Sequence, residues 1–193
     1  WALPFGGFEG NAQTLRLLTR LEPKVFDADG VSFGLNLTRA SLDASCKYPW
    51  VAAEGVGEPG GRTKFGVYDD DRPIFDWFRQ RAEPRRLCIE AQVMDLSDDI
   101  GYSVHDFEDA IVNGYIDVRA LSSRVDHDDL VDSMVEWIVG EISHDDLIAA
   151  FDRLDALADW IESWSGSRRE MGALKNLTST LIGRFAGAAT DAT

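Results

Sequence analysis

Apolar residues recur at helical intervals over most of this chain. A first helix is predicted from leucines spaced by three residues, which are Leu15, Leu18 and Leu21. Pro23 is expected to end it, and a turn-rich piece follows over 27–33. A second helix is expected over about 38–47, where Pro49 stops it because proline disfavours helix in the residue before it.

The longest periodic segment runs from about Arg85 to Asn113. Seven of its apolar residues step by three or four positions, which predicts a helix with one buried stripe. The seven are Ile89, Val93, Leu96, Ile100, Val104, Phe107 and Ile111. Gly114 is well placed to end this helix in the left-handed conformation.

Three more helices are expected near the end of the chain, over about 128–141, 144–163 and 167–186. The segment from Ser143 to Asp146 resembles a capping box for the second of them. Upstream, Asp71 is predicted to cap a short helix with Pro73 in its first turn, and 53–62 reads as a glycine-rich loop. Since no alternating strand of useful length and no internal repeat is found, the predicted fold class is all-α.

The charge is concentrated in one part of the chain. Of the 193 residues 34 are acidic and 19 basic, a formal net charge of −15. Residues 95–155 hold 17 acidic and 3 basic residues, a net charge of −14. Such a block repels a nucleic-acid backbone, so no broad DNA-binding surface is expected, and its commoner meaning is a solvated helical face.

Composition also bears on the class and the compartment. Hydrophobic residues make up 45% of the chain, enough for a packed core. No apolar run approaches the length of about 18–20 residues that a membrane span needs, and no secretory signal is recognised. Cys46 and Cys88 form no disulfide framework, which favours a reducing compartment and a cytoplasmic protein. The chain opens on Trp1, and we expect it to be a piece of a longer protein.

Asp98, Tyr102 and Asp106 are spaced by four residues and therefore lie along one side of the long helix. Asp98 and Asp106 are about 12 Å apart at the helical rise, so they cannot bind the same ion. They could bracket an extended ligand, with a cation at one end and a polar group at the other. The alternative is a solvated acidic face with Tyr102 half packed.

Each of the three histidines precedes an aspartate. His127 and His144 fall at predicted helix starts, where acidic neighbours favour the helix dipole, so capping explains them. His105 stands seven residues after Asp98 and is a weaker candidate for a ligand-facing side chain. No two histidines have the arrangement of a complete metal site.

Basic residues suited to a phosphate lie in the first half of the chain. The main candidates are Lys47 and Lys64, with Arg62, Arg85 and Arg86 nearby in sequence. Lys47 follows a predicted helix, where its charge could instead complement the dipole. The loop before Lys64 lacks the residue order of a P-loop, which excludes that motif, and no Ser-His-Asp or Cys-His arrangement can be argued from spacing.

Five segments of the sequence, which occur in a fixed order, say more about function than composition and periodicity do. They are GGFEGNAQTLRLL, GLNLTRASLDASCKYPW, KFGVYDDDRPIFDW, EAQVMDLSDDIGYSVHDFEDAI and LKNLTSTLIGRF. Together they resemble the deoxyguanosine triphosphate triphosphohydrolases, the dGTPase branch of the HD-domain phosphohydrolases, over essentially the whole chain. The resemblance implies part of an HD-domain-like helical bundle and a metal-dependent enzyme.

The resemblance also implies a metal ligand. Family members hold one divalent metal, Mn²⁺ or Mg²⁺, with a His, a His-Asp pair and a distant Asp. That last ligand opens the D-x-x-x-Y-x-x-x-D pattern and falls on Asp98. The other ligands, and the family's catalytic His and Glu, lie upstream of GGFEGN, where this chain begins. No catalytic residue is therefore assigned here, and the isolated chain is expected to be inactive.

The substrate positions implied by the resemblance come from both halves of the chain. They are Asn11, Lys47, Tyr48, Lys64, Tyr102 and Asp106. The two lysines and Tyr48 match positions near the triphosphate, and Asp106 one near the sugar. Glu9 and Gln13 are expected to be structural or to support the residues that contact the substrate. The expected domains are the C-terminal part of the catalytic core over 1–121 and an acidic helical extension over 122–193.

The implied reaction is attack of a metal-activated water on the α-phosphorus of dGTP, or of another dNTP. The products would be a deoxynucleoside and tripolyphosphate, and lysines would offset the developing negative charge. The alternative is a non-catalytic nucleotide-binding or scaffolding subunit of an HD-domain assembly. The expected partners are the dNTP and a second copy or the missing portion of the same enzyme, without a membrane. Single-stranded DNA has no support in the sequence.

Overall fold

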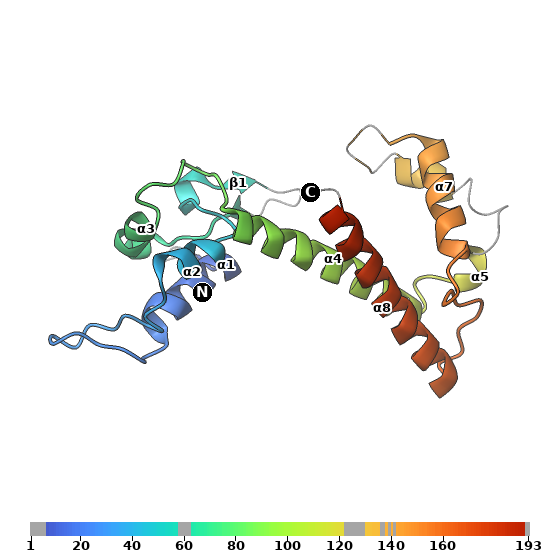
Figure 1. Ribbon diagram of the computed structural model, residues 1–193, viewed down its shortest axis with the longest axis horizontal. Helices are drawn as coiled ribbons and strands as arrows, with labels where there is room; N and C mark the ends of the chain where they lie inside the picture. The colour runs from blue at the N-terminus through green and yellow to red at the C-terminus, as the bar shows by residue number, and fades with distance from the viewer. Residues whose placement is uncertain are drawn as a thin grey trace. The chain divides into compact units, whose positions relative to one another are not determined.

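A computed structural model describes residues 7–57, 63–121, 130–135, 138, 140 and 142–191. Most of its elements are helices, so the all-α class is confirmed (Figure 1). Among the described residues the only paired strands are β1 (Val56–Gly57) and β2 (Thr63–Lys64), which are antiparallel and two residues long. The strand β1 lies inside the segment 53–62 that was predicted as a glycine-rich loop, and β2 directly follows that segment, so the prediction missed this short strand pair. None of the described helices is long and apolar enough to cross a membrane.

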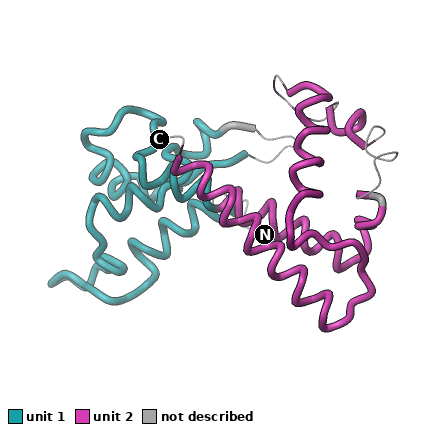
Figure 2. Tube along the Cα trace, turned by 45° about the vertical axis from the view of Figure 1, so that its right-hand side comes forward, with its two compact units in different colours: residues 1–97 teal, residues 98–193 magenta. Residues whose placement is uncertain are grey.

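The chain divides into two compact units, residues 1–97 and 98–193 (Figure 2). The division falls inside the long helix α4 (Ile89–Val112). Each unit has its own apolar cores, and each is described by itself. Because units of dense packing do not define the domains of a family, the expected domains over 1–121 and 122–193 stay a prediction.

The first unit starts with α1 (Gly10–Arg16), which continues as the π-helical turn η2 (Leu17–Leu21). In this wider turn the carbonyl of Leu18 accepts a hydrogen bond of 2.9 Å from the backbone N–H of Leu35. The predicted first helix therefore ends in a π-helical turn, and the backbone of this turn is hydrogen-bonded to the loop that follows it. The turn-rich piece is confirmed, and Phe26 and Ser32 pair across it.

The described residues of the first unit also form four short helices before α4. They are α2 (Arg39–Ala44), η3 (Ala52–Glu54), η4 (Asp69–Asp71) and α3 (Arg72–Phe78). The main core of the unit contains Leu15, Leu42, Cys46, Val51, Val67 and Phe78. The helix expected over 38–47 is shorter than predicted, because the chain turns at Ser45 and carries Cys46 into this core. Lys47 consequently lies in a turn and not in the last turn of a helix.

Asp71 precedes α3 as predicted, but the prediction that its side chain caps the helix is wrong. Its carboxylate accepts hydrogen bonds from Arg16 at 2.7 Å and from Arg20 at 3.0 Å instead. The side chain is 3% exposed, so two guanidinium groups from the first helix satisfy a buried charge. The carboxylate joins the start of α3 to α1 and η2 rather than capping its own helix.

In the second unit, α8 (Arg168–Asp191) packs against the second half of α4 (Figure 1). Their shared core contains Val104, Ile111, Val118, Leu157, Ile161, Leu174, Leu177 and Leu181. A second cluster joins α5 (Val118–Leu121), the helical residues 130–135 and α7 (His144–Asp155) around Val131 and Phe151. The described part of the helix expected over 128–141 is thus helical at 130–135.

The helix ends in this unit agree with local sequence signals, except where packing into the core changes the course of the chain. Gly114 has φ +75° two residues after the end of α4, and Ser143 forms a capping box with Asp146, so both predictions are confirmed. The helix expected over 144–163 stops at Asp155, because the chain turns so that Leu157 and Ile161 enter the core. In contrast α8 runs to residue 191, beyond the predicted end at 186.

The stripe predicted along α4 is buried only in the second unit. Val104 and Ile111 are 3% and 0% exposed, whereas Ile89 and Val93 are 65% and 58% exposed. The prediction of one continuous buried stripe is therefore wrong for its first half. There the fully buried residue is Ala91, so this half of the helix is buried within the first unit at a small side chain.

Candidate functional site

Two segments that carry predicted site residues meet at Glu9. This buried residue precedes α1, and its carboxylate accepts hydrogen bonds from the backbone N–H groups of Asn11 at 2.6 Å and Ala12 at 3.1 Å. The Asn11 side-chain amide donates to the same carboxylate at 3.0 Å. Lys64 Nζ lies 3.9 Å from Glu9 Oε1. One buried carboxylate thus caps a helix and holds Asn11 and Lys64 close together.

Tyr68 ties the same region to the segment that follows Lys64. Its hydroxyl accepts a hydrogen bond from the Glu9 N–H at 3.2 Å and donates to the Glu9 carbonyl at 3.3 Å. The Arg16 guanidinium lies 4.2 Å from the centre of the Tyr68 ring. The start of α1 and the segment 64–68 are therefore joined by backbone, ring and charge contacts.

A second group forms around Trp50. The rings of Tyr48 and Trp50 lie 5.4 Å apart, and the Trp50 indole donates a hydrogen bond of 2.8 Å to the Lys64 carbonyl. The backbones also touch, since a Cβ at Gly66 would lie 2.2 Å from the Tyr48 carbonyl oxygen. Only glycine fits there, and this close approach places the segments of Lys47 and Lys64 side by side.

Lys47 itself reaches α4. Its Nζ lies 2.5 Å from Oδ1 of Asp95, and the two side chains are 19% and 34% exposed. The proposal that Lys47 complements a helix dipole is not supported, because α2 ends three residues earlier. Each of the two candidate phosphate-binding lysines thus has a carboxylate beside it, Asp95 for Lys47 and Glu9 for Lys64.

The thiol groups of the first unit offer no nucleophile. Cys46 and Cys88 are free cysteines. Burial raises the pKa of the Cys46 thiol to about 12, so it stays protonated at neutral pH. This agrees with the absence of a Cys-His arrangement in the sequence.

The predicted site residues of the second unit follow one helix. Asp98, Tyr102 and Asp106 all lie within α4, four residues apart, as the spacing required. All three are exposed, and Tyr102 is 65% exposed rather than half packed. The acidic side of this helix is therefore open to solvent or to a ligand.

His105 also lies on α4, and its side chain is close to the buried carboxylate of Glu108. Its Nδ1 lies 3.8 Å from Glu108, whose carboxylate binds Lys175 and accepts a 2.8 Å hydrogen bond from Thr178. Burial raises the pKa of Glu108, but the hydrogen bonds from Lys175 and Thr178 outweigh it and lower the pKa overall. His144 begins α7 as expected, and His127 lies outside the described residues.

The described residues do not form a complete metal centre. Within them no group of three or more His, Cys, Asp or Glu side chains could hold a metal ion. Asp98 supplies one carboxylate, a ligand type that Mg²⁺ and Mn²⁺ accept. A metal at Asp98 would need further ligands from outside the part of the chain that the structure describes.

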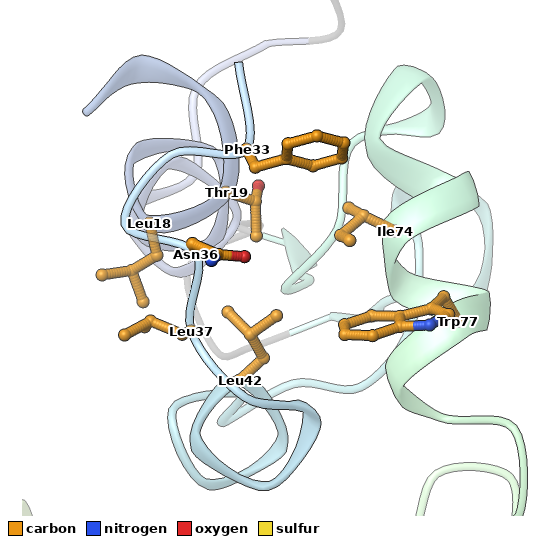
Figure 3. A pocket seen from close by; sticks show the side chains of 8 residues that line it. All are labelled: Leu18, Thr19, Phe33, Asn36, Leu37, Leu42, Ile74 and Trp77. Atoms are coloured by element: carbon orange, nitrogen blue, oxygen red, sulfur yellow. The ribbon is translucent and has the colours of Figure 1, made fainter. Parts of the chain in front are cut away.

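A pocket of about 380 Å³ lies elsewhere in the first unit (Figure 3). Thr19 and Asn36 are its polar residues, and the other side chains that line it are Leu18, Phe33, Leu37, Leu42, Ile74 and Trp77. None of the residues predicted for the site lines this pocket. It is distinct from the groups around Glu9 and Trp50.

Comparison with known proteins assigns the chain to a family, although no protein-family model matches it. A deoxyguanosinetriphosphate triphosphohydrolase-like protein of Streptomyces coelicolor is 51% identical over 189 residues, covering 97% of this chain and 44% of the relative. One of the same name from Bifidobacterium longum is 48% identical, covering 97% of this chain and 40% of the relative. The chain belongs to the deoxyguanosinetriphosphate triphosphohydrolase-like family. It spans less than half the length of these relatives.

In this dGTPase-like chain the predicted positions fall into separate groups. Within the first unit, Asn11 and Lys64 both lie at the Glu9 carboxylate, and Lys47 lies near the Tyr48 ring. The three predicted residues of α4 belong to the second unit. Sequence reasoning missed Trp50 and Asp95. The aromatic KYPW run was a signal for Trp50, but no spacing pairs Asp95 with a lysine 48 positions earlier.

Proposed function

We propose that these residues are part of a metal-dependent dNTP triphosphohydrolase that cleaves dGTP to deoxyguanosine and tripolyphosphate. The observation that carries the proposal is the gathering of Asn11, Lys47, Tyr48 and Lys64 on adjoining segments of the first unit. These are the positions that the family resemblance implies for the substrate. The relatives' names, dGTPase-like, support the same reaction class.

The two lysines suit a triphosphate. An ammonium group has three hydrogen-bond donors, so an ion pair with Asp95 or Glu9 is compatible with contacts to phosphate oxygens as well. Because the chain carries a net charge of −15, attraction of an anionic substrate depends on such local positive groups. Lys47 and Lys64 therefore bind and orient the phosphates, and they offset charge as the ester bond breaks.

In the second unit the residues of α4 have different roles. Tyr102 and Asp106 face the nucleotide, with Asp106 toward the sugar. Asp98 supplies one ligand to a Mn²⁺ or Mg²⁺ ion. When bound, such an ion polarises a phosphoryl oxygen and activates water. The remaining ligands come from a portion of the enzyme beyond these residues, so the 193-residue chain alone is inactive.

The experiment is product analysis of dGTP incubated with Mn²⁺ and either this chain or a version extended to the length of its relatives. The extended protein should release deoxyguanosine and tripolyphosphate, and the chain alone should release neither. In the extended protein Asp98→Ala should lower kcat by about 1000-fold or more, because it removes a metal ligand. Asp152→Asn, a neutralised exposed acid on α7, should stay within about twofold of the parent.

Two results contradict the proposal. One is an extended protein that releases no deoxyguanosine, and the other is an Asp98→Ala variant that keeps the parent's rate. An inactive extended protein that still binds dGTP would favour the second candidate, a non-catalytic nucleotide-binding or scaffolding subunit. Turnover by the 193-residue chain alone would contradict the expectation that it lacks metal ligands.

A further inference from the structure

We infer that Asp95 is a positioning residue that aims the Lys47 ammonium at the substrate's triphosphate. The inference rests on the proposed function, because it assumes that Lys47 meets phosphate. It adds a residue that the family resemblance did not assign. Both side chains belong to the first unit, and their contact is part of that unit's packing.

The ion pair is close and sheltered. Lys47 Nζ and Asp95 Oδ1 are 2.5 Å apart. The Oδ1 atom is buried from solvent, and apart from this contact with Lys47 no hydrogen-bond partner among the described residues reaches it. A buried carboxylate oxygen without a partner is costly, so the arrangement depends on the ammonium being there.

The backbone that carries Lys47 is held independently of Asp95. Tyr48 lies against Gly66, and the Gly66 N–H donates a hydrogen bond of 3.1 Å to the Trp50 carbonyl. What remains adjustable is the four-carbon stem of the lysine, which has many rotamers. An ion pair that restricts these rotamers before substrate arrives lowers the entropy lost on binding.

The negative charge of Asp95 allows an experiment to distinguish a positioning role from a purely electrostatic one. A carboxylate next to a bound triphosphate repels it, so an acid acting through its charge alone weakens substrate binding. Replacing such an acid with a neutral residue would tighten binding. A positioning residue has the opposite effect, because its loss removes the ion pair that restricts the lysine side chain. The sign of the change therefore separates the two roles.

The pair between Lys64 and Glu9 is not an equivalent case. Its 3.9 Å separation is longer, and the Glu9 carboxylate already caps α1 and binds the Asn11 amide. A substitution of Glu9 would disturb a helix start as well as a lysine. Asp95 is therefore the residue at which positioning can be tested cleanly.

The experiment is a double-mutant cycle on Asp95→Asn and Lys47→Met in the extended protein. Two readouts are measured, the KM and kcat for dGTP and the Kd for inorganic tripolyphosphate by calorimetry. With Lys47 present, Asp95→Asn should raise KM and Kd about 10-fold, within the range of coupled neighbouring residues. In the Lys47→Met background the same substitution should change neither value.

Two further variants keep the test independent of folding. Glu90→Gln neutralises an exposed acid on the same helix and should leave KM and Kd unchanged. Asp95→Glu keeps a carboxylate and should retain more affinity than Asp95→Asn. Circular dichroism of each variant checks the helical content.

Tighter tripolyphosphate binding by Asp95→Asn would overturn the inference. So would a change in Kd that persists in full when Lys47 is absent. Failure of the proposed function is recognised separately, since the unsubstituted protein would then not hydrolyse dGTP. The tripolyphosphate measurements would still decide whether Asp95 acts through Lys47.

Discussion

Glu170 organises the start of α8 with a single carboxylate. Its Oε2 atom accepts hydrogen bonds from the backbone N–H groups of Ser165 at 2.9 Å and Ser167 at 3.1 Å. The hydroxyls of the same two serines donate to it at 2.6 and 2.8 Å. Hydrogen bonds from Ser165 and Ser167 lower the pKa of Glu170 to about 2. The ionised side chain therefore joins the loop over 165–167 to the helix.

A pH dependence follows from this shift. A carboxylate whose pKa is depressed by folding stabilises the protein fully above its unfolded pKa of about 4.3, and the effect is lost as the pH falls toward 2. Glu170→Gln should reduce stability at pH 7 and flatten its dependence on pH between about 4.3 and 2. Thermal unfolding across this range measures both effects.

Glu162→Gln is the matched control, since Glu162 is an exposed acid of the same unit. It should leave the melting temperature and its acid limb close to those of the parent. If Glu170→Gln behaves like this control, the serine contacts do not stabilise the start of α8.

At the scale of elements, α4 has two different environments along one hydrophobic pattern. Its second half contributes Val104 and Ile111 to the core with α8, and Ile111 is fully buried. In its first half Ile89 and Val93 are exposed, and the Lys47 contact is made by Asp95. Apolar residues of the same periodic pattern therefore contribute differently to the free energy of folding in the two units.

Alanine substitutions should reveal this difference. Ile111→Ala should lower the free energy of unfolding by about 2–5 kcal/mol, because it leaves a cavity in the core. Val93→Ala removes an exposed side chain and should cost less than about 0.5 kcal/mol. Urea titration of this chain measures both values. Equal losses would show that the first half of α4 is packed in solution.

At the scale of the whole molecule, the charges and the candidate ligands are unevenly distributed. Residues 95–155 carry 17 acidic and 3 basic residues, and they include Asp98 and Asp106. The lysines suited to phosphate, Lys47 and Lys64, precede this block. High negative charge alone does not hold a metal tightly, because ligands must converge, and the described residues bring no three of them together.

Metal titration of the 193-residue chain follows from this. Mn²⁺ should bind it no more tightly than a Kd of about 10⁻⁴–10⁻³ M, the range of weakly organised carboxylate sites. The extended protein should bind Mn²⁺ at least about 10-fold more tightly, and Asp98→Asn should remove that gain. Calorimetry measures each Kd. Tight binding by the short chain would contradict an incomplete metal site.

Local signals in the sequence were sufficient for the fold class and for several helix ends. The left-handed turn at Gly114 and the capping box from Ser143 to Asp146 depend on neighbouring residues, so spacing alone predicted them. The family could also be predicted from the sequence, because long motifs in a fixed order extend over the whole chain. The roles of individual site residues remain predictions.

Only the tertiary structure decided which segments meet. Asp71 binds Arg16 and Arg20 instead of capping α3, and Lys47 faces Asp95 instead of a helix dipole. Each of these pairs joins residues about 50 positions apart, a separation that no local periodicity encodes. The sequence by itself determined the all-α class, several helix ends and the family. The fold decided which charges are paired and which half of the α4 stripe is buried, because both depend on long-range packing.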